Sequence, residues 1–583
     1  MRDLGAIVIV LLIYSYPAVR ARIELGSTIV PPLFAPDLTL YLNLSNIASV
    51  DGNQVLNPYY SVPVPDRGTG YLKFRFGATL FGRLDKLLSG RIWIAMFVWN
   101  IFWWALLCIA ALWLFERFLP ADSRSVAILG LGFLLFFNFG VLKTLLLAWI
   151  HLPSLTNFQS IDLPFMRAFI PQIPIAFLLA YLGLQMQALR RKDPLPWVAM
   201  ALLQLLALSV FPYATLMMAG LTAVSVLSQI CFGNLPGMWR IPLFYGIACA
   251  AVDAAFLRDG SVGFYATRSH LLHFQPALLP HLVGGNWLLL CLLTVGIALS
   301  KNFPGEIKWP LVGLGIANLI LMLGDAIVPA TTILLSHHAG HFLHMTTAVL
   351  LTFLVSSALS SARLRPAILR VALGFACALL LLNGVLLTQA TYRQFLAYNR
   401  QEVDIARFLT SWKSMEGDLF IAHSLLVDDD CELVALISRK QVLFCTDAEV
   451  MLTPEQNRDI HRFRQAMYLY FTGKNSDYLR DIIRDPKSTE PLYRLGYWAE
   501  TASLSPEERT EGLRSIQTDL LPWMERVENQ DIALRQFFRQ FPRIIVIDDA
   551  QKPVFLPSRL GSFLVRQAEQ RSNNLEITLY FPQ

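Results

Sequence analysis

The sequence predicts a polytopic α-helical membrane protein with a separate C-terminal α/β domain. Of its 583 residues, 55% are hydrophobic and only 15% are charged, and the mean hydropathy is +0.48, which excludes an ordinary water-soluble protein. Apolar runs near the roughly 20 residues that a bilayer requires recur along the chain as far as Thr388. From about Tyr392 the composition changes to that of a soluble domain.

The first apolar run, Leu4–Val19, follows Arg2 and is short for a span. Small residues near Ala18 and Ala21 are compatible with a signal peptide, but a polytopic protein needs no removable signal, so we expect an uncleaved anchor. Both interpretations place the next segment outside. With this run the sequence predicts about eleven transmembrane helices. The other spans are expected at Ile92–Phe115, Val126–Ile150, Ala168–Leu189, Pro196–Val210, Ala214–Cys231, Ile241–Leu257, Leu279–Leu299, Trp309–Ile333, Phe342–Leu359 and Ile368–Thr388.

Basic residues assign the topology. If the N-terminus is cytoplasmic, Lys and Arg gather in every inner loop, as the positive-inside rule requires. The net charge of +6 is therefore topological, and we expect no nucleic acid partner. This topology predicts a membrane domain over residues 1–390, with a first outer loop at 20–91, and an extracytoplasmic domain over 391–583.

Three ionisable residues interrupt the spans, and all fall in the outer half of their helices: Lys143, Asp253 and Asp325. An intramembrane charge is costly and is a functional candidate, although snorkelling or an ion pair between helices is the alternative. Because all three residues are expected near the outer surface of the membrane, they favour a site at the outer interface. A transporter would be expected to place such groups nearer the midplane.

The first outer loop contains a polar and aromatic stretch, Leu33–Tyr60. Asp37 follows a proline at the expected start of a short helix, and Tyr41 lies one turn further along the same face. A turn at Asp51-Gly52-Asn53 should end the helix. Asn57 precedes a proline, so the chain through Tyr60 is expected to be extended.

This stretch resembles bacterial members of the GT-C superfamily, integral-membrane glycosyltransferases that use polyprenyl-phosphate sugars. The resemblance rests on Asp37, Tyr41-Leu42, Gly52 and Asn57-Pro58-Tyr59. Many relatives carry a second acidic residue after the first, whereas Leu38 stands here. The resemblance implies a GT-C-like membrane domain and an extracytoplasmic C-terminal domain. It also implies that Asp37 is the general base, whereas position alone equally fits a helix-start carboxylate.

A second group of candidates lies at the turn before the tenth span: His337, His338, His341 and His344. The spacing of His341 and His344 could place them on one helix face for a metal or a phosphate. No Cys or carboxylate stands at metal-ligand spacing, so phosphate or sugar contact is preferred; no metal site is assigned, and a divalent cation stays open. His341-Phe342 also resembles a His-aromatic position of the family.

A third candidate precedes the fourth span, where Arg167 to Gln172 resemble an Arg, Pro-Gln pattern of the same proteins. An Arg beside the headgroups can bind a lipid phosphate bidentately, although interfacial anchoring is an equal alternative. Arg268 is a further phosphate candidate. The residues expected to bind substrate or lipid phosphate are Tyr41, Asn57, Tyr59, Tyr60, Arg167, Arg268, His338 and His341.

These residues predict a membrane glycosyltransferase that moves a sugar from a polyprenyl-phosphate donor to a glycan, lipid or protein acceptor at the outer face of the membrane. The enzyme would lie in the cell inner (plasma) membrane with membrane lipid around it. Two alternatives stay open. One is a lipid-linked glycan polymerase, ligase or transporter, and the other is a non-catalytic membrane scaffold.

In the C-terminal domain, strands are expected at Asp418–His423, Gln441–Cys445, Arg543–Ile547, Lys552–Leu556 and Leu575–Phe581. Helices are expected at Tyr392–Lys413, Cys431–Ser438, Pro454–Tyr470 and Ser476–Arg484. Cys431 and Cys445 share this domain, and they could form a disulfide in an oxidising compartment or remain two buried thiols.

Overall fold

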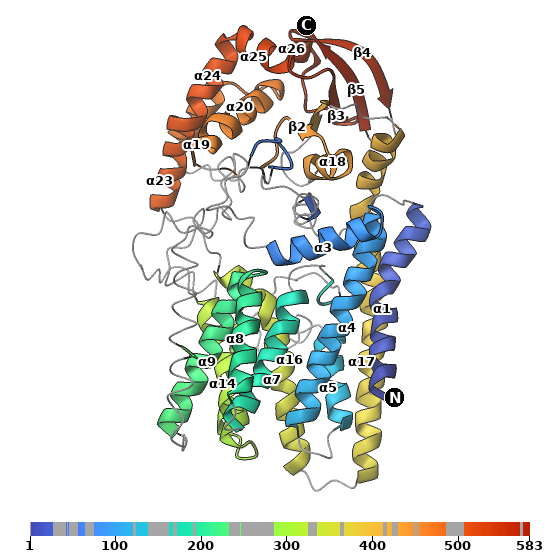
Figure 1. Cartoon of the computed structure of the whole chain (residues 1–583), viewed down its shortest axis with the longest axis vertical. Coiled ribbons are helices and arrows are strands. Elements are labelled where there is room, and N and C mark those ends of the chain that lie inside the picture. The colour runs from blue at the N-terminus through green and yellow to red at the C-terminus, as the bar shows by residue number, and fades with distance from the viewer. Residues whose placement is uncertain are drawn as a thin grey trace. The chain divides into compact units, whose positions relative to one another are not determined.

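The chain folds into two compact units (Figure 1). The computed structural model describes residues 2–26, 42–43, 45, 56–63, 75–119, 124–137, 163–166, 172–190, 194–232, 245–246, 285–323, 335–361, 366–411, 417–422, 430–446, 448, 452, 454–485, 506–571 and 575–583. Unit 1 comprises Met1–Glu24, Ile94–Arg258 and Ser269–Ala397. Unit 2 comprises Leu25–Trp93, Asp259–Arg268 and Tyr398–Gln583.

Apolar helices build unit 1. They are α1 (Arg2–Leu25), α4 (Ile92–Phe118), α5 (Arg124–Phe136), α7 (Gln172–Arg190), α8 (Leu195–Leu208), α9 (Pro212–Phe232), α13 (Gly285–Leu299), α14 (Gly305–Met322), α16 (Leu335–Ser361) and α17 (Pro366–Ser411). Among the described residues, 7 helices are long and apolar enough to cross a membrane, and the apolar segments of α5, α8 and α13 are shorter. The polytopic α-helical class is therefore confirmed. The span expected at Ile241–Leu257 lies almost entirely outside the described residues.

Close backbone approach joins α9 to α14. A Cβ added to Gly313 would lie 2.8 Å from the Leu221 carbonyl oxygen, so only glycine permits this crossing. Ser225 Oγ lies in the same crossing and is 2.6 Å from the Leu221 carbonyl oxygen and 3.3 Å from that of Trp309. Small residues thus replace bulky side chains where two apolar helices must touch.

Neutral polar side chains provide a second set of helix contacts in unit 1. The Tyr181 hydroxyl on α7 lies 2.6 Å from Thr222 Oγ1 on α9 and 2.8 Å from the Tyr245 hydroxyl. Tyr245 in turn donates to Gln204 Oε1 on α8 at 2.9 Å. These hydrogen bonds satisfy buried polar groups without placing a charge among the helices.

Helix α17 runs unbroken for 46 residues and includes both the expected last span and most of the helix expected at Tyr392–Lys413. The division between the units falls within it, after Ala397. The sequence analysis grouped residues 20–91 with the membrane domain, whereas residues 25–93 belong to unit 2. The described residues 56–63 and 75–91 therefore lie in the same compact unit as the C-terminal sheet.

Unit 2 contains a five-stranded mixed sheet in the order β2-β1-β3-β5-β4. Strand β1 (Leu419–Ala422) pairs in parallel with β2 (Gln441–Val442) and β3 (Ile544–Asp549), while β5 (Leu575–Pro582) is antiparallel to β3 and β4 (Leu564–Arg571). The helical segments are α3 (Arg75–Leu87), α18 (Asp430–Ser438), α19 (Pro454–Gln456), α20 (Arg462–Phe471), α21 (Ser476–Arg484), α23 (Pro506–Ser515), α24 (Leu521–Asn529), α25 (Asp531–Phe538) and α26 (Pro557–Gly561). Two π-helical turns, Asn457–His461 and Ile516–Leu520, precede α20 and α24.

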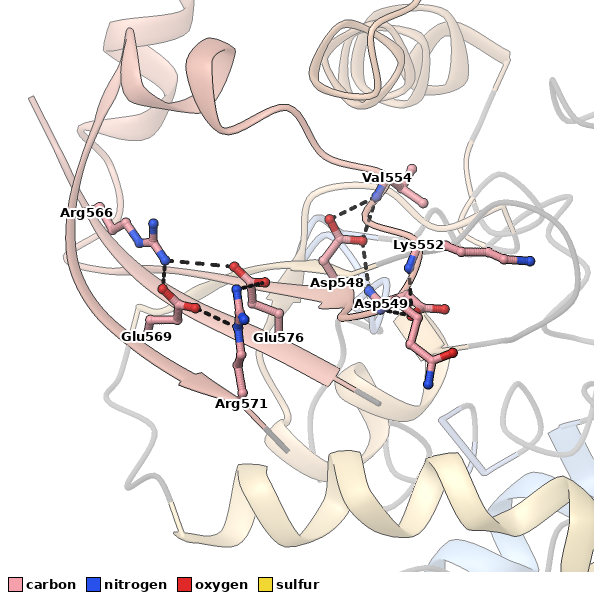
Figure 2. A network of polar contacts seen from close by, with 9 residues as sticks. Asp548, Asp549, Lys552, Val554, Arg566, Glu569, Arg571 and Glu576 are labelled. Atoms are coloured by element: carbon pink, nitrogen blue, oxygen red, sulfur yellow. Dashed lines mark hydrogen bonds and ion pairs between the residues drawn. The ribbon is translucent and has the colours of Figure 1, made fainter. Parts of the chain in front are cut away.

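The strand expected at Lys552–Leu556 is wrong. Asp548, at the end of β3, accepts hydrogen bonds from the backbone N–H groups of Val554 and Phe555, each at 2.9 Å, and folds this segment into a turn (Figure 2). The Leu556 N–H donates to the Phe471 carbonyl at 2.8 Å. Backbone N–H groups that a strand would donate to a neighbouring strand therefore donate to the Asp548 side chain and to the Phe471 carbonyl instead.

Strand β4 was not predicted from the sequence because polar residues occur on both of its faces. After Leu564 each of its residues is exposed, so it shows no apolar alternation. Arg566 and Glu569 form an ion pair on this strand, and Arg571 lies 3.2 Å from Glu576 on β5 (Figure 2). Charged side chains of this kind discourage unwanted pairing at a sheet edge.

Candidate functional site

Four of the predicted site residues lie outside the described residues, namely Asp37, Tyr41, Arg167 and Arg268. The intramembrane candidates Lys143, Asp253 and Asp325 lie outside them as well. Of the predicted regions, the structure describes the turn at Asn57–Tyr60 in unit 2 and, separately, the start of α16 and the turn at Leu163–Met166 in unit 1.

The Asn57 side chain shapes the turn that it begins. Asn57 Oδ1 accepts hydrogen bonds from the Tyr59 and Tyr60 N–H groups at 2.9 and 3.2 Å, an Asx turn. The Ser61 N–H returns to the Asn57 carbonyl at 2.9 Å, and Ser61 has a φ of 54°. The chain thus reverses direction here. The expected extended course was wrong because the Asn side chain reaches past the proline to bond the backbone beyond it.

Long-range hydrogen bonds fix this turn against residues far away in the sequence. Asn57 Nδ2 donates to the Ala448 carbonyl at 3.0 Å. The Tyr59 carbonyl accepts a hydrogen bond of 2.9 Å from Val442 N in β2. Nearer the start of the loop, Asn43 Nδ2 donates to the Glu432 carbonyl at 2.9 Å. The first outer loop is therefore held at two places by the C-terminal part of unit 2.

Tyr60 lies at the centre of a buried polar cluster. Its hydroxyl shares a hydrogen bond of 3.0 Å with His461 Nδ1, and the Arg464 guanidinium stacks 4.3 Å from the centre of its ring. Arg464 Nη1 also donates to the Val442 carbonyl at 2.8 Å. Tyr60 is 1% exposed, His461 0% and Arg464 6%, so water does not reach the centre of this cluster.

Burial sets the charge state of this cluster. It raises the pKa of the Tyr60 phenol well above its ordinary value, with Arg464 opposing the shift. Burial, followed by the nearby Arg462 and Arg464, holds the pKa of His461 well below its ordinary value. Burial also lowers the pKa of Arg464, to about 10. At neutral pH the cluster therefore contains one cation beside a neutral phenol and a neutral imidazole.

These contacts give the predicted substrate-binding residues of this turn a structural role. Asn57, Tyr59 and Tyr60 are all at most 1% exposed, and the two rings present no open surface for stacking. A direct contact with the donor or acceptor stays a prediction. The structure adds that the turn is buried and hydrogen-bonded to Ala448 and Val442.

The histidines near the start of α16 have different neighbours. His338 lies within α16. The His341 ring is partly buried and packs edge-on against Phe211 with centroids 6.1 Å apart. His344 Nε2 shares a 2.7 Å hydrogen bond with the Leu134 carbonyl, and its ring packs against Phe165. His344 is thus engaged within unit 1, and phosphate contact by His338 and His341 stays a prediction.

The turn at Leu163–Met166 is strained and strongly held. Phe165 has a φ of 60°, a conformation that costs a residue other than glycine about 1–3 kcal/mol. The Phe165 carbonyl accepts hydrogen bonds from Trp104 Nε1 at 3.1 Å and Gln172 Nε2 at 2.8 Å. Leu163 N donates to Thr391 Oγ1 at 2.9 Å. Strain of this kind is often stored at functional sites, and Arg167 follows two residues later.

No group of three or more His, Cys, Asp or Glu side chains that could hold a metal ion occurs among the described residues. The described contacts around the Asn57–Tyr60 turn offer hydrogen-bond donors and two buried arginines, Arg462 and Arg464.

The sequence analysis missed the residues that hold both turns. Trp104, His461 and Arg464 were not among the predicted site residues. The available signal was weak: basic residues at 458, 461, 462 and 464 cluster in the helix predicted at Pro454–Tyr470. Only the pairing of this helix with a segment some 400 residues earlier explains them, since His461 and Tyr60 are 401 residues apart in the chain.

No family model and no curated protein matches this chain. Among solved structures, it superimposes on the arabinofuranosyltransferase AftD from Mycobacteria with a TM-score of 0.50 and 13% sequence identity, covering 100% of this chain and 40% of that one. The chain thus spans less than half of AftD.

Two further structures align over most of this chain. The Archaeoglobus fulgidus oligosaccharyltransferase has a TM-score of 0.43 at 12% identity, covering 87% of this chain and 70% of that one. ArnT from Cupriavidus metallidurans has a TM-score of 0.37 at 11% identity, covering 99% and 97%. The AftD superposition supports, at the level of the fold, the GT-C-like architecture expected from the sequence.

Proposed function

We propose, from the premise of a GT-C fold, that this chain is a membrane glycosyltransferase that uses a polyprenyl-phosphate sugar. The observation that supports the proposal most is the agreement of two independent results. The fold is shared with a membrane arabinofuranosyltransferase, and the outer-loop residues Asp37, Tyr41-Leu42 and Asn57-Pro58-Tyr59 resemble the same superfamily. A pentosyl donor and a hexosyl donor are both compatible with the shared fold and with the loop residues.

In the proposed reaction, the Asp37 carboxylate accepts the proton of the acceptor hydroxyl as that oxygen attacks the anomeric carbon. The bond from the anomeric carbon to the phosphate oxygen breaks, and the polyprenyl phosphate leaves as an anion. Arg167, Arg268 and the His338–His341 turn supply positive charge or hydrogen bonds to that phosphate. Direct displacement assisted by one base inverts the anomeric configuration.

The proposed location is the inner (plasma) membrane, with the N-terminus in the cytoplasm and unit 2 outside. A sugar on polyprenyl phosphate would then meet its acceptor at the outer surface. The buried Asn57–Tyr60 turn supports this mechanism indirectly because it would hold the loop that carries Asp37 in a fixed position during transfer.

The test is transfer of radiolabelled sugar from a panel of polyprenyl-phosphate sugars in membranes that contain wild type or Asp37→Asn at matched expression. The substitution preserves side-chain size and removes the base, so transfer should fall by about 100-fold or more. Asp51→Asn, in the expected turn of the same loop, is the matched control and should retain transfer. Equal transfer by wild type and Asp37→Asn would remove Asp37 from the mechanism.

A non-catalytic scaffold makes the opposite prediction. In that case no donor supports transfer, and loss of Asp37 leaves the cellular phenotype unchanged, while disruption of unit 2 abolishes it. A polymerase, ligase or transporter of lipid-linked glycans would instead show substrate at the bilayer midplane.

A further inference from the structure

Two cysteines meet inside unit 2. Cys431 lies in α18 and Cys445 follows β2, and their Sγ atoms are 2.7 Å apart. Cys431 is 2% exposed and Cys445 0%. In the structure both side chains are thiols. The sequence could state only that the two residues share a domain, whereas the fold brings their sulfur atoms into direct contact.

Among the described residues, no third ligand completes a metal site with this pair. A structural zinc site needs four ligands and a catalytic one three, usually from Cys, His, Asp and Glu. Among the described residues no group of three such side chains is close enough together to hold an ion. Two contacting cysteines outside the membrane spans can exist as a dithiol or as a disulfide. The redox state of the compartment decides between these two forms.

The position of the pair indicates what a bond between the two sulfurs would do. Glu432, next to Cys431, accepts the hydrogen bond of Asn43 through its carbonyl at 2.9 Å. The Cys445 carbonyl lies 3.5 Å from the Tyr60 hydroxyl. The two cysteines are thus adjacent to the two places where unit 2 holds the first outer loop, one on α18 and one after β2.

We propose that Cys431 and Cys445 form a disulfide that braces the two attachment points of the first outer loop. The cross-link joins α18 to the segment after β2. The backbone that accepts the hydrogen bond of Asn43 and the backbone beside the Tyr60 hydroxyl then cannot separate. The proposal rests on the extracytoplasmic position of unit 2 given under the proposed function. It does not depend on the role of Asp37 or on the identity of the donor.

The oxidation balances by thiol–disulfide exchange. A thiolate of one cysteine attacks the disulfide of an extracytoplasmic thiol oxidoreductase, and the second thiolate then displaces the oxidoreductase from the mixed disulfide. One sulfur–sulfur bond forms in unit 2 and one breaks in the oxidoreductase, which takes up the two electrons and the two protons and leaves as its dithiol. Because both cysteines are buried in the folded unit, the exchange occurs while unit 2 folds.

The first experiment is differential alkylation of full-length protein from membranes. Cells are lysed into denaturant with N-ethylmaleimide, and the protein is then reduced, labelled with iodoacetamide and analysed by mass spectrometry. We expect iodoacetamide on Cys431 and Cys445, a cross-linked peptide in the unreduced sample, and N-ethylmaleimide on the other five cysteines, Cys108, Cys231, Cys249, Cys291 and Cys377. N-ethylmaleimide on both Cys431 and Cys445 would overturn the proposal.

The second experiment tests the bracing role by hydrogen exchange in detergent. Reduction should raise the exchange rate of amides in residues 56–63 by roughly ten-fold or more, since closing a loop of this length has a large effect on local opening. A Cys431→Ser, Cys445→Ser double variant should exchange at the fast rate with or without reductant. A cross-linked pair whose reduction leaves residues 56–63 unchanged would overturn the brace.

A third variant separates this proposal from the topology on which it rests. Gln567 on β4 is exposed, and Gln567→Cys in the double-serine background gives one accessible thiol on unit 2. Labelling of intact cells by a membrane-impermeant maleimide is expected if unit 2 is extracytoplasmic. Labelling together with unoxidised Cys431 and Cys445 in wild type would refute the disulfide alone. Failure to label would refute the topology, and with it the disulfide, while Asp37 would still be tested by the transfer assay.

Discussion

The turn at Leu163–Met166 in unit 1 and the turn at Asn57–Tyr60 in unit 2 both lie close in sequence to predicted substrate-binding residues, yet different chemistry holds them. Neutral donors hold the first: an indole, a carboxamide and a backbone amide that donates to a threonine hydroxyl. The second depends on a buried guanidinium as well as neutral groups.

The difference follows from the solvent available to each unit. A cation among membrane helices is costly because no water can solvate it if its partner moves away. In unit 2, Arg464 is buried but has carbonyl and carboxamide acceptors from Val442 and Gln441 and lies over an aromatic ring. A charge placed in this way fixes a position strongly, and its removal leaves acceptors without a donor.

The largest expected effect is therefore at Arg464. Arg464→Met retains the length of the side chain but leaves the Val442 carbonyl without its buried donor, and we expect the opening free energy of unit 2 to fall by about 3–4 kcal/mol. Hydrogen exchange of peptides covering Arg462–Phe471 measures this. Arg480→Met is the control, because Arg480 is 41% exposed in its ion pairs with Asp477 and Glu525 and its loss should change stability far less. Similar losses in the two variants would contradict the comparison.

Removal of the Asn57 side chain should have the next largest effect. Asn57→Ala loses one donated and two accepted hydrogen bonds, and we expect residues 56–63 to open more easily by about 2–3 kcal/mol. Exchange of those amides is the measurement. Asn529→Ala, which removes an exposed contact of Asn529 Nδ2 with the Glu525 carbonyl, should change its own region by about 0.5 kcal/mol or less. An unchanged loop in Asn57→Ala would show that the Asx turn is not what holds it.

The neutral contacts of unit 1 should be individually weaker. Gln172→Leu removes one of the two donors to the Phe165 carbonyl while Trp104 remains, so a loss of about 1–2 kcal/mol is expected. Gln185 provides the control on the same helix: it is equally buried, and its carboxamide atoms have no hydrogen-bond partner within the described residues. Gln185→Leu should be neutral or stabilising in thermal unfolding of the detergent-solubilised protein. A reversed order would refute the role assigned to Gln172.

The smallest expected effect is a pH dependence of unit 2. Because the folded-state pKa of His461 lies below its unfolded value near 6.5, the unfolded chain takes up a proton that the folded chain does not as the pH falls through that value. Unit 2 should lose stability below pH 6.5, with a slope from this residue of at most about 1.4 kcal/mol per pH unit. Tyr60 and the cations Arg462 and Arg464 surround His461 and maintain the shift. His461→Gln should flatten the slope in exchange measured from pH 7.5 to 5.5, and an unchanged slope would assign it to other groups.

Local patterns predicted most elements and few of their contacts. Ser476–Arg484 has the expected bounds, because an amphipathic pattern and the Asn475 side chain that caps it are contained in one stretch of sequence. Strand β4 was missed because its neighbours, rather than its own alternation, make it a strand. Lys552–Leu556 failed as a strand because Asp548, outside the pattern, takes its amides.

The sequence by itself predicted a membrane region, an α/β domain after it and a first loop whose residues resemble the GT-C superfamily. Hydrophobicity, helix length and turn chemistry act over a few tens of residues and can be read locally. The tertiary structure alone decided that this loop belongs to unit 2, that Tyr60 meets His461 and Arg464, and that Cys431 meets Cys445. Burial and hydrogen-bond satisfaction across hundreds of residues fix those contacts, and no local pattern records them.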